Sequence, residues 1–213
     1  MKKLPFIIIL SFFITAVQAQ NDVKAGQILE SVSQKYKTVP AFKANFTILR
    51  ESSANGVKPE TDLGAIKVKG SKYHIKLKEQ EVFNNGNTVW TYLKKGNEAT
   101  ITDYMPDDDA LSPTNIYTIY KKGYKYVFVE EAKEAGQTYE VVDLIPEKKN
   151  QQVYKIKLTI DKKTKTLKRW KVFEKNGNRY TYTINDFVPL NIEDKEFVFD
   201  KAKYPGVAIE DLR

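Results

Sequence analysis

The spacing of apolar side chains changes once, sharply, near the start of this chain. Over residues 22–37 the apolar positions recur every three or four residues, which predicts an amphipathic helix capped by Asp22 and ended before Pro40. Beyond Pro40 the period falls to two. Phe42 and Phe46, for example, share one side of an extended segment whose other side is polar. This pattern predicts strands with one buried face.

Alternating segments of this kind continue almost to the end of the chain. Asn-Gly pairs at 85–86 and 176–177 supply the positive-φ residues that tight hairpin turns require. The segments amount to roughly eleven antiparallel strands, the last a short one at 197–199. No Pro-, Gly- or Ser-rich linker divides them, so we expect one domain over residues 20–213.

One segment after an acidic cluster interrupts the strand series. Ser112 is a favourable helix N-cap, Pro113 suits the first helical position, and Gly123 suits the C-terminal end. We therefore predict a short helix over residues 113–122, with its apolar side chains against the sheet.

Residues 1–19 have the features of a secretory signal peptide. Lys2 and Lys3 precede a run of about a dozen apolar residues, and Val17 and Ala19 provide small side chains at a cleavage site. The run is shorter than the roughly 18 residues that a transmembrane anchor needs. The chain has no cysteine to carry a lipid anchor. We expect a soluble mature protein outside the cytoplasm.

Composition excludes several kinds of chemistry. Without cysteine the chain has no disulfide and no thiol nucleophile. Its single histidine, His74, alternates with Tyr73 and Ile75, which places it on the lysine-bearing face as an exposed residue. Residues 107–109 are acidic but lack the spacing and glycine of a calcium loop. We expect no enzymatic activity, no metal site and no cofactor.

The net charge of +8 comes from lysines that are interleaved with acidic residues along the strands. This arrangement is typical of a solvated outer face, so we expect no nucleic-acid partner. The apolar face of so long a sheet must be buried in a sandwich, in a barrel, or around other elements. Its large aromatic residues either fill a core or line a hollow, and periodicity leaves both interpretations open.

Four motifs follow one another in this chain: Phe42-x-Ala44-x-Phe46, Gly64-x-Ile66-x-Val68-Lys69, the stretch from Asn85 to Tyr92, and Phe197-x-Phe199 with the tail from Tyr204 to Asp211. Together they resemble the periplasmic outer-membrane lipoprotein carrier family, called LolA-like. The resemblance covers nearly the whole mature chain.

The resemblance implies a mainly β fold: an unclosed antiparallel β-barrel with a lid of short α-helices over a hydrophobic cavity. It also implies a monomeric periplasmic carrier of acylated lipoproteins. The cargo would come from an inner-membrane ABC-type lipoprotein release transporter and pass to an outer-membrane acceptor. The helix at 113–122 would be part of the lid. The candidate lipid-binding residues are Phe42, Phe46, Ile66, Val68, Tyr73, Ile75, Trp90, Tyr92, Ile101, Ile116 and Ile119.

One position departs from the family pattern. Members of the family carry an Arg-Pro pair after the second strand, and its arginine helps to latch the lid. Gly70-Ser71 stands there in this chain, so the latch is absent, replaced by Lys69 or Lys72, or located elsewhere. Two alternatives therefore stay open: a carrier of another envelope lipid or glycolipid, and a lipoprotein-sensing domain of the same fold.

Overall fold

Twelve strands form one sheet, with the first and the eleventh side by side at its centre. The computed structural model describes residues 22–106, 112 and 114–213, so the predicted signal peptide and the acidic cluster at 107–109 lie outside the described residues. The strands are β1 (Ala41–Glu51), β2 (Glu60–Lys69), β3 (Lys72–Lys76), β4 (Gln80–Asn84), β5 (Thr88–Leu93), β6 (Glu98–Asp103), β7 (Tyr124–Glu134), β8 (Gln137–Pro146), β9 (Val153–Asp161), β10 (Leu167–Glu174), β11 (Arg179–Pro189) and β12 (Ala208–Asp211).

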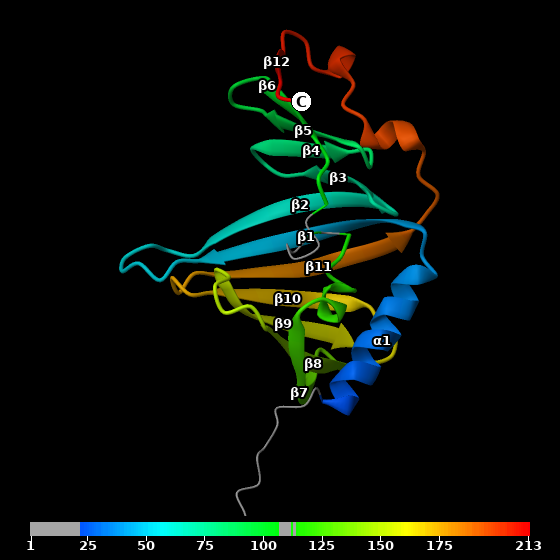
Figure 1. Cartoon of the computed structure of the whole chain (residues 1–213), viewed down its shortest axis with the longest axis vertical. Coiled ribbons are helices and arrows are strands. Elements are labelled where there is room, and N and C mark those ends of the chain that lie inside the picture. The colour runs from blue at the N-terminus through cyan, green and yellow to red at the C-terminus, as the bar shows by residue number, and fades with distance from the viewer. Residues whose placement is uncertain (1–21, 107–111, 113) are drawn as a thin grey trace, which may run out of the picture.

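The strand order is β12-β6-β5-β4-β3-β2-β1-β11-β10-β9-β8-β7. Every neighbouring pair is antiparallel except β12 and β6. The sheet twists strongly, and its two edge strands, β7 and β12, lie at opposite ends of the molecule (Figure 1). This is the unclosed β-barrel that we expected, with twelve strands in place of about eleven.

The helix α1 (Val23–Lys37) confirms the prediction from the 3.6-residue period. Oδ1 of Asp22 accepts a hydrogen bond from the Ala25 N–H at 3.1 Å, which caps the helix and holds the pKa of this carboxyl below its ordinary value. Oδ2 of the same side chain accepts from the Phe128 N–H at 3.2 Å. Asp22 thus begins α1 and fixes it to β7.

The helix predicted over residues 113–122 is wrong: the described part of this segment is a series of turns, with only a 3₁₀-helix at η1 (Ile119–Lys121). Side chains compete here with helical backbone bonds. Oδ1 of Asn115 accepts from the Ser112 N–H at 2.8 Å, and Oγ1 of Thr118 donates to the Asn115 carbonyl at 3.1 Å. The β-branched residues also have a low helix propensity.

We call Ser112 and residues 114–122 the cover segment. Its Ile116 and Ile119 are buried against the sheet, as predicted. α1 and the cover segment lie over the same side of the sheet (Figure 1). We call this side, which carries Phe42 and Ile66, the inner face. The main core lies between these two elements and the inner face.

The C-terminal part of the chain covers the opposite, outer face of strands β3 to β6. The short strand predicted at 197–199 is wrong, because this part forms the 3₁₀-helices η2 (Asp194–Phe197) and η3 (Lys201–Lys203) before β12. Phe199 and Val207 from this part pack on Phe83 in a second, smaller core. Lys69 and Lys72 both bind Asp194, at 2.8 and 2.7 Å, and so hold this part to the β2–β3 hairpin.

The expectation of an exposed His74 is wrong for the same reason. Its ring is buried at 6% exposure, stacks on Phe83 with ring centroids 4.0 Å apart, and lies 3.1 Å from Oε2 of Glu81. The Tyr204 hydroxyl donates to the same carboxylate oxygen at 3.2 Å. The alternation along β3 correctly places His74 opposite Tyr73, but the C-terminal part of the chain then covers it.

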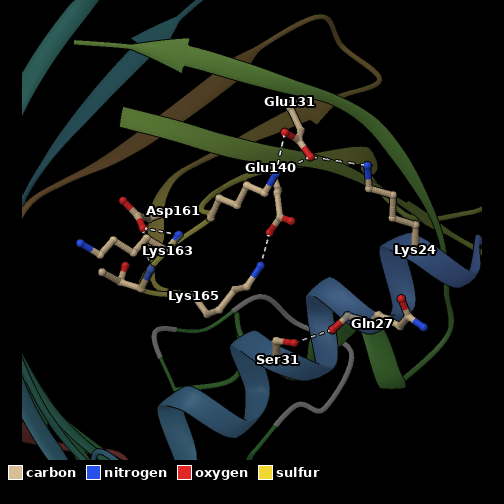
Figure 2. Close-up of polar contacts among 10 residues, drawn as sticks. Lys24, Gln27, Ser31, Glu131, Glu140, Asp161, Lys163 and Lys165 are labelled. Carbon is tan, nitrogen blue, oxygen red and sulfur yellow. Dashed lines mark hydrogen bonds and ion pairs between the residues drawn. The ribbon is translucent and has the colours of Figure 1, made fainter. Parts of the chain in front are cut away.

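An ion pair also joins the N-terminal end of α1 to the sheet (Figure 2). Glu131 of β7 accepts from Nζ of Lys162 at 2.8 Å and lies 3.7 Å from Nζ of Lys24 on α1. In the same view, Nζ of Lys165 donates to Oε2 of Glu140 at 2.6 Å. The side chain of Glu140 is buried, so this lysine compensates a carboxylate that water does not reach.

Candidate functional site

An apolar cavity of about 250 Å³ lies between the inner face and the cover segment. It takes side chains from the centre of the sheet, where alternation directs every second residue of each strand inward. Its walls are Phe46, Ile48, Ile66, Ile75, Leu77, Ser112, Trp170 and Tyr182. These walls are almost wholly hydrocarbon and aromatic, so the cavity suits an apolar ligand without a fixed orientation.

A second, smaller hollow of about 40 Å³ continues from the cavity toward α1. Phe46, Ile66 and Trp170 line both spaces. The ring of Tyr36 on α1 closes the deep end, stacked on Tyr117 with ring centroids 4.5 Å apart. The space thus runs from the middle of the sheet toward the helix.

Trp170 and Tyr182 form one wall of the cavity as a stacked pair. Their ring centroids are 4.9 Å apart and their planes differ by 7°. Burial raises the pKa of Tyr182, because its anion would lose contact with water. Further out on the same face, Arg50 forms an ion pair with Asp62. The wall is therefore neutral inside and charged beyond the cavity.

The cover segment is bound to α1 by one polar cluster. Glu30 of α1 accepts from the Tyr120 hydroxyl at 2.7 Å and lies 2.7 Å from Nζ of Lys121. The hydrogen bonds from Lys121 and Tyr120 lower the pKa of Glu30 to about 2. Gly70-Ser71 forms only the turn between β2 and β3, with Gly70 at φ +59°. This cluster thus joins the cover segment to α1.

The structure brings together eight of the eleven predicted site residues, on the inner face or in the cover segment that lies over it. Phe46, Ile66 and Ile75 line the main cavity, and Phe42 and Ile116 line the smaller hollow. The remaining three, Val68, Tyr73 and Ile119, belong to the packed core beside these spaces.

Trp90, Tyr92 and Ile101 do not join them, which corrects their placement in the cavity wall. Trp90 pairs across the sheet with Phe83 on one side and with Ile101 on the other, so all three side chains share the outer face with His74. Trp90 and Tyr92 pack on the second core beneath the C-terminal part of the chain. An aromatic-rich strand indicates burial but does not show which face is buried.

Five residues that line the cavity were not among the predicted site residues: Ile48, Leu77, Ser112, Trp170 and Tyr182. Ile48 could have been found, because it continues the alternation of Phe42 and Phe46. Trp170 and Tyr182 lie more than a hundred residues after Phe46 and Ile48 in the chain. They reach the site only because β11 pairs with β1. No local pattern encodes that pairing.

The family model described as "Outer membrane lipoprotein carrier protein LolA" matches residues 37–200, which is most of the chain and includes the sheet from β1 to β11. The chain belongs to the LolA family. No curated protein sequence matches it.

Solved structures resemble this LolA-family chain in fold at low sequence identity. An uncharacterized conserved protein from Thermus thermophilus superposes with a TM-score of 0.60 at 12% identity, over 88% of this chain and 99% of that one. A LolA superfamily protein from Nitrosomonas europaea has a TM-score of 0.46 at 12% identity, over 83% and 98%. LprF from Mycobacterium bovis superposes with a TM-score of 0.46 at 12% identity, over 81% of this chain and 97% of that one. At this level of sequence identity the similarity shows the fold alone.

In the part of the chain that the structure describes, no helix has the length and apolar character to cross a bilayer.

Proposed function

We propose that this LolA-family protein binds the acyl chains of lipoproteins in the apolar cavity and carries them through the periplasm. It would receive them from an inner-membrane release transporter and deliver them to an acceptor at the outer membrane. The observation that supports this proposal is an apolar cavity beneath the cover segment, which contacts α1 through Glu30. No step of such transport requires a general base, a nucleophile or a metal.

The energetics of acyl chains explain why a carrier is needed. Each buried methylene contributes about 0.8 kcal/mol, so a chain of about 16 carbons resists transfer into water by roughly 10 kcal/mol or more. A carrier must offer comparable apolar surface. Phe46, Ile66 and Trp170 offer non-directional contact, which suits acyl chains that differ in length.

The size of the cavity indicates how loading proceeds. Its 250 Å³ lies just below the range of about 300–1,000 Å³ typical of ligand sites, so the cover segment must move to admit an acyl chain. Ile116 and Ile119 then leave the sheet as the lipid takes their place. Exchange of one apolar contact for another keeps net affinity moderate, and it leaves little apolar surface exposed when the carrier is empty.

Tryptophan fluorescence tests this proposal directly. Trp170 lines the cavity and Trp90 lies on the outer face, and these are the only two tryptophans. Palmitate titrated at micromolar concentration should change the emission of the wild type and of Trp90→Phe. Trp170→Phe should retain palmitate binding by calorimetry and lose the emission change. Absence of binding to all three proteins would refute the carrier proposal.

The absence of the family's Arg-Pro pair favours a second cargo, a glycolipid or another envelope lipid, in the same cavity. Mass spectrometry of the molecules that copurify with the protein from the cell envelope distinguishes the two. Acylated peptides support lipoprotein transport, whereas lipids without peptide support the alternative.

A further inference from the structure

Strand β2 is paired along its whole length on one side and along only half of it on the other. Its ladder with β1 runs from Glu60 to Lys69, but its ladder with β3 ends at Ala65 opposite Lys76. Among the described residues, none pairs with positions 61–64 on the β3 side. A stretch of open strand edge therefore lies inside the sheet.

The hairpin between β2 and β3 decides which backbone groups face this opening. Lys69 and Lys72 flank a two-residue turn and therefore form a hydrogen-bonded pair. Hydrogen-bonded and non-hydrogen-bonded pairs alternate in an antiparallel ladder, so every second residue of β2 directs its N–H and C=O toward β3. Ala65 is the last of these to have a partner. The backbone groups of Leu63 and Thr61 point into the opening.

A groove of about 690 Å³ runs along this open edge. It exists because the chain turns away at the end of β3, where the Leu77 N–H donates to the Gln80 carbonyl at 2.8 Å. Gly64 allows Phe46 and Leu77 to pack closely against β2 at this opening. A Cβ atom on Gly64 would lie 2.4 Å from the ring of Phe46 and 2.8 Å from Leu77.

The groove adjoins the apolar cavity, and Phe46 and Leu77 line both spaces. A ligand whose acyl chain fills the cavity would leave it past these two side chains, beside the open edge. We infer that the polypeptide segment next to the acylated residue of a lipoprotein binds here as an added strand on β2. This inference rests on the proposed function and specifies how the cargo's protein part is held.

The chemistry of the edge favours a peptide over a sugar headgroup. An extended backbone alone repeats N–H and C=O groups at the spacing that an open strand presents, and this recognition does not depend on side chains. One carrier can then accept many lipoproteins. Leu63 is 71% exposed beside the edge, where natural sheets usually place charges or proline to prevent pairing.

The two lysines along the groove add little charge preference. Nζ of Lys76 lies 3.6 Å from Glu81, and Nζ of Lys78 lies 3.8 Å from Glu79, so each has an acidic neighbour. The recognition that we infer is therefore by backbone hydrogen bonds rather than by charge.

Three synthetic probes separate this inference from the proposed function: palmitate, an N-terminally palmitoylated heptapeptide, and the same lipopeptide with alternate backbone nitrogens methylated. Dissociation constants are measured by calorimetry for the wild type, Leu63→Pro and Leu63→Ala. Proline at 63 removes one N–H from the open edge and leaves the ladder with β1 intact, since edge strands tolerate proline. Alanine removes the exposed side chain and keeps the N–H.

We expect methylation to weaken binding of the lipopeptide to the wild type about tenfold, from two or three lost hydrogen bonds. Leu63→Pro should bind the unmodified lipopeptide several-fold more weakly, whereas Leu63→Ala should match the wild type. All three proteins should bind palmitate equally. The methylated probe needs no variant, so a misfolded Leu63→Pro would not affect that arm.

One result would overturn the added strand, and another would overturn the carrier proposal. Equal binding of the methylated and unmodified lipopeptides, with palmitate still bound, would overturn the added strand and leave the carrier proposal standing. Failure of the wild type to bind palmitate or either lipopeptide would overturn the carrier proposal itself.

Discussion

The hydroxyl of Tyr120 donates a hydrogen bond of 2.7 Å to Glu30 and so joins the cover segment to α1. Lys121, the next residue, lies 2.7 Å from the same carboxylate. The two elements that cover the inner face therefore share one polar cluster. Movement of the cover segment requires that these contacts break, and this makes the cluster the latch in the proposed loading step.

Tyr120→Phe should accelerate loading. The substitution keeps the ring and removes the hydroxyl, so the closed arrangement loses a charge-assisted hydrogen bond while the cavity stays unchanged. Stopped-flow mixing with a fluorescent acyl probe should give an association rate several-fold above the wild type. Tyr117→Phe is the control, because it lies in the same segment but stacks on Tyr36 and leaves the latch intact. Equal rates for both variants would contradict the latch.

The stability of the latch should depend on pH only under acidic conditions. Glu30 has an ordinary pKa of 4.5, lowered to about 2 by the hydrogen bonds from Lys121 and Tyr120. A lowered pKa means that the ionised form stabilises the closed arrangement. This contribution is complete above about pH 4.5 and is lost as pH falls toward 2. The association rate should be constant from pH 5 to 8 and should rise below 4.5. Circular dichroism must show that the protein is still folded, and Glu30→Gln should show no such rise.

Ile75→Trp should block the cavity, and Ile101→Trp should not. Both substitutions enlarge an isoleucine within the same half of the sheet, but the register places Ile75 on the inner face and Ile101 on the outer face. The added ring at 75 occupies the space for an acyl chain, so palmitate affinity should fall at least tenfold by calorimetry. Overpacking in Ile75→Trp should lower the unfolding free energy by about 1–3 kcal/mol. Comparable loss of affinity in Ile101→Trp would mean that lipid binds on the outer face.

His74 should make the protein less stable as pH falls from 7 to 5. Burial lowers its pKa below 6.5, partly offset by the hydrogen bond to Glu81. The unfolded chain then binds a proton that the folded protein resists, so stability declines as pH falls through 6.5. The melting temperature of the wild type should drop across this interval, and His74→Gln should show a smaller drop. Burial raises the pKa of Glu81, but the contacts with His74 and Lys76 lower it by a larger amount, to below its ordinary 4.5. The stability that ionised Glu81 contributes is therefore lost only below about pH 4.5. An unchanged slope in His74→Gln would contradict this assignment.

Lys165→Met should destabilise the fold by about 2 kcal/mol, because it leaves the buried carboxylate of Glu140 without its partner. Lys165 has φ +56°, and methionine keeps the Cβ atom, so the backbone strain is the same in both proteins. Lys163→Met in the same turn removes an exposed lysine and should change the unfolding free energy by less than about 0.5 kcal/mol (Figure 2). Urea unfolding measures both. Equal changes in unfolding free energy for the two variants would contradict the stabilising role of the Lys165–Glu140 pair.

The sequence by itself determined α1 and most of the strands of this protein. The change of period from 3.6 to 2 after Pro40 located α1 and the start of the sheet, and the Asn-Gly pairs located two hairpins. These features are local, because a helix cap or a tight turn involves residues only a few positions apart. The alternation also assigned Phe46 and Ile75 to a common face correctly.

Only the tertiary structure decided which residues share the cavity. Trp170 joins Phe46 through the pairing of β11 with β1. The register of β5 on β4 places Trp90 on the outer face, which the C-terminal part of the chain covers. His74 is buried by the same part, which lies more than a hundred residues away in sequence. Strand alternation is symmetric between the two faces of a sheet, so the pattern tells which residues point together. What covers each face depends on contacts between distant segments, and no local period records them.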